Sequence, residues 1–297
     1  MKDQAQNLRD IIKKKNKEPK RTCSAKVIAI TSGKGGVGKT NVALNLAIDF
    51  INRGKKTLIL DADLGLANIE VLLGIVPKYN LSDVIYGKKI ITDIITIGPN
   101  EVKFISGGSG IRELTSLTET QIKTFAQNLN LLDKMVDIII IDTGAGISDT
   151  VMTFLGFADE VLLVTTPEPT AITDAYALLK VFSDKIKKGD INVKLVINKV
   201  KDENEGQKIF EKIKKVADKF LNIKVEDLGY LPNDECLEKS VRSQEAVIIK
   251  YPKSEITIAL KKLAEKILNI KTDKSNAKGL KMFIELVKNK INIIKDL

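Results

Sequence analysis

Residues 26–41 read KVIAITSGKGGVGKTN, and this stretch decides the fold. Its first six residues form an apolar, β-branched run, which predicts a strand buried on both faces. A helical spacing of apolar side chains follows the stretch. Between strand and helix lies the pattern G-x-x-x-x-G-K-[ST], met by Gly33, Gly38, Lys39 and Thr40. A glycine-rich turn in this context predicts a phosphate-binding loop, because its backbone N–H groups and the helix N-terminus point at bound phosphate.

The loop also predicts how a nucleotide and its metal ion are held. Lys39 should reach the β- and γ-phosphates, and the Thr40 hydroxyl should bind Mg²⁺. A merely tight turn is the alternative, but a chance match to the pattern is expected in only about one of a hundred such chains. The residues expected to line the nucleotide are Gly33, Lys34, Gly35, Gly36, Val37, Gly38, Lys39, Thr40 and Asn41.

Strand and helix patterns alternate along the rest of the chain. Continuous apolar runs predict strands over residues 26–31, 56–62, 102–106, 136–142, 160–166, 193–198 and 224–231. Helical spacing predicts helices over residues 41–52, 118–134, 170–187, 203–221 and 254–268. Such alternation predicts an α/β P-loop NTPase fold, in which a mostly parallel, twisted sheet is flanked by helices on both faces.

Acidic residues follow two of the predicted strands. Asp61 and Asp63 come at the end of one and would point the same way if the strand continued that far. Asp142 ends the hydrophobic strand 136–142, which is the position of the carboxylate that holds Mg²⁺ through water. Glycines after it, including Gly146, allow a second switch segment. Because ligands lie beyond the carboxyl ends of parallel strands, these acids and the loop should meet; capping of the next helix is the alternative for Asp61.

The choice of base can be read from Asn198-Lys199-Val200-Lys201. This run resembles the start of the guanine-reading N-K-x-D, but Lys201 stands where a carboxylate would accept the hydrogen bonds of guanine. The sequence therefore predicts ATP and ADP as ligands and disfavours GTP.

Composition limits the class of protein. The 297 residues are 43% apolar and 29% charged, as in an ordinary globular protein. No run of eighteen apolar residues predicts a membrane span, and the N-terminus lacks the apolar region of a secretory signal. Cys23 and Cys236 cannot build a disulfide framework or a four-ligand metal site. A reducing cytoplasm is the simplest compartment.

The net charge of +10 lies at the two ends of the chain. Residues 1–26 and residues 261–297 each carry +6, which leaves −2 for the middle. Basic ends are typical of interaction tails, although they can also simply keep a protein soluble. The slightly acidic middle makes nucleic acid an unexpected partner. Linkers at residues 13–24 and 271–279 divide the chain into an arm (1–24), one domain (25–270) and a C-terminal segment (271–297).

A second lysine, Lys34, extends the loop pattern to K-G-G-x-G-K-T. With this lysine the chain resembles the MinD/ParA family of deviant Walker A ATPases. The resemblance implies a slow ATPase switch whose ATP-bound form is a homodimer, in which Lys34 crosses to the partner's phosphates. An extra cation there would stabilise the charge on the transferred γ-phosphate, so Lys34 and Lys39 are both expected to be catalytic. A solvated loop lysine is the alternative for Lys34.

The resemblance also implies roles for residues outside the loop. Asp63 would orient or activate the attacking water, and Asp61 would support the water shell of Mg²⁺. Asn68 would belong to the first switch segment. Asn198 would touch adenine, and Pro232 would lie in a second segment beside the base.

Two stretches resemble the FlhG (YlxH) branch of this family, which regulates flagellar number and placement. Residues 3–9 match its D-Q-A-x-x-L-R arm, and residues 165–176 (TTPEPTAITDAY) resemble its segment after the fifth core strand. The resemblance implies that Gln4 enters the active site of the FlhF GTPase and orients water there. Flagellar switch (C-ring) proteins are further implied partners. A frayed amphipathic start is the alternative for the arm.

Other branches of the family are the rival interpretations. A septum-site MinD shares the mechanism but lacks the arm, and a ParA-type partition ATPase would need a basic body. A nitrogenase-reductase-like protein needs paired cysteines that this sequence does not place correctly. From another class, the chain could be a nucleotide-gated scaffold in which hydrolysis acts only as a timer.

The last segment predicts an amphipathic helix. Steps of about 100° from Leu280 place its apolar side chains on an arc of roughly 200°, interrupted by Lys290, with lysines opposite. This pattern is typical of a helix that lies on an anionic membrane surface, so the protein is expected at the inner face of the plasma membrane. Docking on the protein's own sheet is the alternative. The side chains expected to enter the membrane are Phe283, Ile284, Val287, Ile291 and Ile294.

Overall fold

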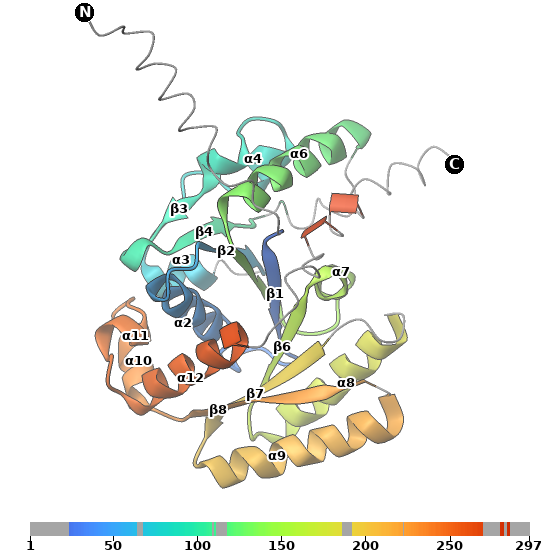
Figure 1. The fold of residues 1–297 in the computed structure, drawn as a ribbon, viewed down its shortest axis with the longest axis vertical. Coiled ribbons are helices and arrows are strands. Elements are labelled where there is room, and N and C mark those ends of the chain that lie inside the picture. Colours follow the sequence, from blue (N-terminus) through green and yellow to red (C-terminus); the bar gives the residue numbers. More distant parts are fainter. Residues whose placement is uncertain are drawn as a thin grey trace, which may run out of the picture.

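The structure is a computed structural model, and it describes residues 24–63, 68–108, 110, 118–185, 192–221, 223–269, 280–281 and 284–285. Its centre is a single sheet of eight strands in the order β3-β4-β2-β5-β1-β6-β7-β8 (Figure 1). The strands are β1 (Lys26–Thr31), β2 (Thr57–Ala62), β3 (Thr96–Ile97), β4 (Lys103–Ser106), β5 (Ile138–Thr143), β6 (Glu160–Thr165), β7 (Asn192–Val200) and β8 (Val225–Pro232). All neighbours pair in parallel except β3, which runs antiparallel to β4 at the edge.

Helices cover both faces of this sheet (Figure 1). On one face lie α4 (Leu81–Ile85), α6 (Glu119–Met135), α7 (Asp149–Phe157), α8 (Pro169–Lys185) and α9 (Glu203–Val216). On the other lie α2 (Lys39–Asn52), α3 (Asn68–Leu73), α11 (Val247–Lys250) and α12 (Glu255–Asn269), with α10 (Glu235–Arg242) beside them. Shorter turns are η1 (Ile91–Ile94), η2 (Pro99–Glu101) and η3 (Ala217–Leu221). The predicted fold class is therefore confirmed.

Most predicted elements agree with the structure to within two residues. The helix predicted over 203–221 is shorter, because α9 ends at Val216 and the π-helical turn η3 follows. The pattern did not predict β3, α3, α4, α7, α10 or α11. Periodicity is a weak signal over so few residues: β3 has two residues and α11 has four. Side-chain caps mark several of the helix starts, such as Ser148 at α7, which accepts the backbone N–H of Val151.

The described residues of the C-terminal segment pack on the body of the protein. Leu280 is 3% exposed and Ile284 is 5% exposed, and both belong to the core between the sheet and α4 and α6. Leu280 lines a small apolar cavity with Leu81 and Phe125. Ile284 thus shows the docked alternative in this conformation, where it is buried against the protein's own apolar residues, and its entry into a membrane stays a prediction. Phe283, Val287, Ile291 and Ile294 lie outside the described residues.

No helix in the described part of the chain is both long enough and apolar enough to cross a membrane.

Candidate nucleotide-binding site

The phosphate-binding loop joins β1 to α2 at the carboxyl edge of the sheet. Gly38 is the residue before α2, with a left-handed backbone at φ 97°, and its carbonyl accepts the N–H of Val42. A Cβ at Gly38 would also lie 2.4 Å from the amide nitrogen of Asn198. Both the backbone conformation and the lack of space therefore require glycine here.

Asn198 supports the loop from β7. Its side-chain amide donates to the carbonyl oxygen of Val37 over 2.8 Å, and its amide oxygen accepts the backbone N–H of Lys199 over 2.9 Å. The residue is 1% exposed. The structure thus gives Asn198 a bracing contact that the sequence did not predict. Its contact with adenine stays a prediction.

The other positions beside the expected base can also be located. Pro232 ends β8, where it pairs with Val200 at the same edge of the sheet as Asn198. Asn41 lies in the first turn of α2, and its carbonyl accepts the side-chain N–H of Asn45. Gln4 lies outside the described residues, and the one cysteine inside them is Cys236 at the start of α10.

Lys39 lies beneath the loop among carboxylates. It is 8% exposed, and burial lowers its pKa, while the nearby charges of Asp142 and Asp63 raise it. An ammonium placed in this way can neutralise a phosphate without competition from bulk water. The structure therefore brings together the lysine and the two acids that the sequence predicted from three separate segments.

Asp142 is the most buried of the acids. Neither of its carboxylate oxygens has a hydrogen-bond partner in the described part of the chain. Burial raises its pKa to about 7, the Thr40 side chain lowers it, and the neighbouring Asp61 raises it again. A buried carboxylate that forms no hydrogen bond of normal geometry, with the Thr40 hydroxyl nearby, fits a cation, so Asp142 and the Thr40 hydroxyl are the residues that would hold Mg²⁺.

The raised pKa of Asp142 predicts how the stability of the metal-free, nucleotide-free protein depends on pH. A carboxyl group whose pKa is higher in the folded state than in the unfolded state favours folding at low pH. That contribution is lost as pH rises from about 4 to about 7, by on the order of 4 kcal/mol. In Asp142→Asn this part of the decline should be absent, as measured by urea unfolding across that pH range. Asp218→Asn, at an exposed position, should keep the slope of the wild type, and an unchanged slope in Asp142→Asn would contradict the prediction.

Asp61 binds backbone rather than facing an open space. Asp142 and Asp61 are register partners on β5 and β2, but the two oxygens of Asp61 accept the N–H groups of Asp63 and Ile69, each over 3.2 Å. Burial raises the pKa of Asp61 to about 6, and these two N–H groups lower it. The structure therefore gives Asp61 the capping contact at α3, and its support of the metal's water shell stays a prediction.

Asp63 follows β2, which ends at Ala62. One of its oxygens accepts the side-chain N–H of Asn68 over 3.0 Å. Asn68 is the first residue of α3, so the two residues predicted for water activation and for the first switch contact each other directly. Movement of this segment would reorient Asp63.

Gly146 connects the second predicted switch segment to the loop. Its N–H donates to the carbonyl oxygen of Ser32 over 2.9 Å, and its φ is 93°. The segment after Asp142 is therefore in direct backbone contact with the phosphate-binding loop. A conformational change in the segment can therefore displace the loop, and a change in the loop can displace the segment.

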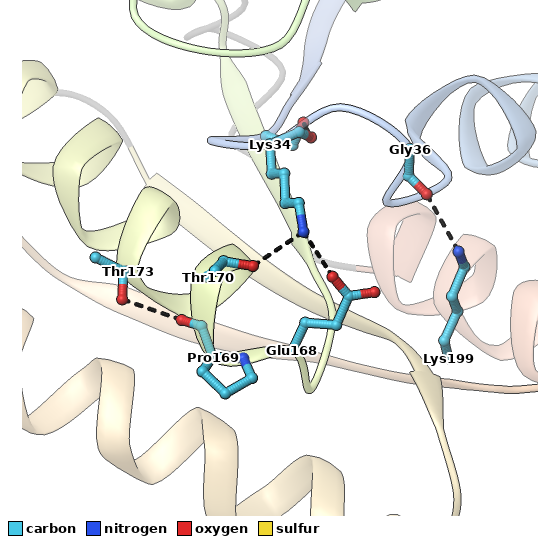
Figure 2. Close-up of polar contacts among 8 residues, drawn as sticks. Lys34, Gly36, Glu168, Pro169, Thr170, Thr173 and Lys199 are labelled. Atoms are coloured by element: carbon cyan, nitrogen blue, oxygen red, sulfur yellow. Dashed lines mark hydrogen bonds and ion pairs between the residues drawn. The ribbon is translucent and has the colours of Figure 1, made fainter.

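Lys34 contacts residues of its own chain. Its Nζ donates to the Glu168 carboxylate over 2.7 Å and to the Thr170 hydroxyl over 2.9 Å (Figure 2). On the other side of the loop, Lys199 donates to the carbonyl oxygen of Gly36 over 3.2 Å. The sequence did not predict Glu168, Thr170 or Lys199 as site residues. The stretch 165–176 and the Asn198-Lys199 pair were the available signals.

Comparisons with known proteins show the family of this chain. Residues 24–268 match the ParA family model, described as the NUBPL iron-transfer P-loop NTPase. The antiactivator FleN of Pseudomonas aeruginosa is 41% identical over 241 residues, 81% of this chain and 85% of FleN. The flagellum site-determining protein YlxH of Helicobacter pylori is 37% identical over 223 residues, 74% of each chain. The structure of the cell division ATPase MinD from Pyrococcus furiosus superimposes with a TM-score of 0.66 at 25% identity, covering 83% of this chain and 99% of that one.

Proposed function

Because this chain belongs to the ParA/MinD family of P-loop NTPases, we propose that it is a slow, Mg²⁺-dependent ATPase switch that regulates flagellum number and placement. One observation supports the switch above all: Lys39, Asp63 and Asp142 meet beneath a loop that also carries Lys34. The flagellar role rests on the likeness to FleN and YlxH.

The residues divide the work of phosphoryl transfer. Lys39 and the loop N–H groups would hold the phosphates, and Thr40 and Asp142 would hold Mg²⁺, which would supply positive charge to offset the negative charge of the phosphates. Asp63 positions the attacking water, and Asn68 holds Asp63. Lys34 supplies an additional cation to the phosphates of a second copy of the chain.

The switch requires that the chain hydrolyse ATP and pair in response to it. Purified protein should release phosphate from ATP only with Mg²⁺, and it should elute from a sizing column as a dimer with Mg²⁺ and a non-hydrolysable ATP analogue but as a monomer with ADP. Absence of both hydrolysis and pairing would sink the proposal.

The arm at residues 1–24 connects the switch to flagella, and its key residue is Gln4. A peptide of residues 1–20 should accelerate GTP hydrolysis by FlhF, because a glutamine placed in a GTPase site orients the attacking water. The same peptide with Gln4→Ala should leave the rate of FlhF alone. Phosphate release under single-turnover conditions measures this, with Gln6→Ala as the matched control. If the wild-type peptide left the rate of GTP hydrolysis by FlhF unchanged, the proposed role of the arm in stimulating FlhF would be excluded.

The C-terminal segment provides a route to the membrane. Leu280 and Ile284 are buried against the rest of the protein. The segment must therefore dissociate from the domain before its apolar side chains can insert into an anionic membrane surface at the inner face of the plasma membrane. Binding of one segment would be weak, and pairing doubles the number of anchors. The membrane-bound protein would then contact flagellar switch (C-ring) proteins.

Ile291→Lys together with Ile294→Lys tests this anchor without disturbing Leu280 and Ile284. Vesicles that contain phosphatidylserine should sediment the wild type with Mg²⁺ and the ATP analogue, and the double variant should stay in the supernatant, because lysines on the apolar arc oppose insertion. A chain ending at Lys271 should behave like the double variant. Neutral vesicles are the control. Equal sedimentation of all three proteins would count against the anchor.

A MinD-type role in septum positioning is the second candidate, favoured by the superposition on P. furiosus MinD. The two roles share the ATP switch and the membrane anchor. They differ in the arm, so the FlhF assay separates them.

A further inference from the structure

Lys34 is held at the start of α8 by two side chains. Glu168 directly precedes this helix, and its carbonyl accepts the N–H of Ile172. The Lys34 ammonium lies between the Glu168 carboxylate, at 2.7 Å, and the Thr170 hydroxyl, at 2.9 Å (Figure 2). Two of the three N–H groups of the ammonium are thus used inside the subunit.

Electrostatics make Glu168 the necessary part of this contact. A helix N-terminus carries partial positive charge, so it repels a cation placed beside it. The Glu168 carboxylate is favourable both to the helix end and to Lys34, and Lys34 lowers the pKa of Glu168. The positive charge of Lys199 lowers the pKa of Glu168 further, by less. Without the Glu168 carboxylate, the Thr170 hydroxyl would be the remaining partner of Lys34, and the ammonium would lie beside the partial positive charge of the N-terminus of α8.

The backbone beneath Lys34 is fixed to the same helix. A Cβ at Gly33 would lie 2.2 Å from the backbone carbonyl of Asp174, which shows how closely the start of the loop packs on α8. The position of Lys34 above Glu168 and Thr170 therefore follows from tertiary packing as well as from its own side chain.

We propose that Glu168 and Thr170 keep Lys34 on its own subunit, and that ATP-dependent pairing has to break this contact. The inference rests on the proposed pairing. Glu168 is then a positioning residue that weakens the dimer, since a contact made only in the single subunit shifts the equilibrium toward it. Formation of one dimer breaks two such contacts, one in each chain. The factor by which they change the dimer dissociation constant is therefore the square of the factor for a single contact.

Exposure sets the size of this effect. The side chains of Lys34 and Glu168 are 37% and 56% exposed, so the pair is weak and sensitive to salt. From the usual range for exposed pairs, removal of two contacts tightens the dimer by roughly twofold to roughly thirtyfold.

The test is Glu168→Gln in the full chain. Its dimer dissociation constant, measured by sedimentation with Mg²⁺ and a non-hydrolysable ATP analogue, falls below that of the wild type at low salt, and the difference shrinks at high salt. Thr170→Val shifts it in the same direction by less. Glu235→Gln is the matched control, because it removes one carboxylate from another exposed pair, Glu235 with Lys239 in α10, and leaves the dimer unchanged.

The outcomes separate this inference from the proposed function. A wild type that stays monomeric refutes the pairing itself. If the wild type pairs and Glu168→Gln pairs equally or more weakly, the proposed pairing stands, but the proposal that Glu168 weakens the dimer by holding Lys34 is refuted. A gain in dimer affinity of Glu168→Gln that does not depend on salt also refutes this proposal, since an exposed ion pair must weaken with salt.

Discussion

Replacing Asp63 with alanine is expected to lower the rate of ATP hydrolysis at least about a hundredfold while ATP still binds. Asp63 lies beside Lys39 and is held by Asn68, so its carboxylate can orient a water molecule at the γ-phosphate. The phosphates are expected to be held by the loop and Lys39, and Mg²⁺ by Thr40 and Asp142, so ATP binding should survive the loss of the Asp63 carboxylate. Phosphate release and the binding of a fluorescent ATP analogue measure the two effects separately.

Loss of hydrolysis should also preserve the dimer. With Mg²⁺ and ATP, Asp63→Ala should elute as a dimer for as long as ATP is present, whereas the wild type should return to the monomer as ATP is consumed. Asn68→Ala should give a smaller loss of rate, because it removes only the contact that holds Asp63. Asp218→Ala, at an exposed position of η3, should match the wild type. Hydrolysis at the wild-type rate in Asp63→Ala would exclude the water-orienting role.

The second large effect is expected for Gly33→Ala. The added methyl group would lie 2.2 Å from the backbone carbonyl carbon and oxygen of Asp174, and backbone atoms inside a helix cannot move aside. The loop must then shift by about 1 Å, which costs about a hundredfold in rate when catalytic groups are misplaced. Overpacking should also lower the free energy of unfolding by about 1–3 kcal/mol. Nucleotide binding, phosphate release and urea unfolding measure these effects.

Gly156→Ala is the matched control for this change. Gly156 lies in α7, and apart from its own helix no described residue has an atom within 4 Å of the added methyl group, so the exchange should leave binding and hydrolysis as they are. A Gly33→Ala protein with wild-type affinity and rate would show that the loop does not depend on its contact with α8.

Local patterns predicted the centre of the site because that information lies in short segments. The loop pattern, its strand and its helix occupy one continuous stretch, and each acid ends its own apolar run. Asp142, Asp63 and Lys39 could be placed together because parallel strands end at one edge of a sheet. The same reasoning predicted β1 to the residue and the other long strands to within two residues.

The partners of these residues could not be predicted, because they come from distant parts of the chain. Lys34 and Glu168 are 134 residues apart, and Asn198 and Val37 are 161 apart. Asp61 had two plausible roles in the sequence, and the structure shows one of them, the contact with the backbone N–H groups of Asp63 and Ile69. The apolar arc that includes Leu280 and Ile284 fits a membrane or a protein core equally well by periodicity. The sequence by itself thus determined the fold and the position of the phosphate-binding loop. Only the tertiary structure decided the contacts of Lys34, Asn198 and the C-terminal segment, since side-chain contacts between distant residues leave no local pattern.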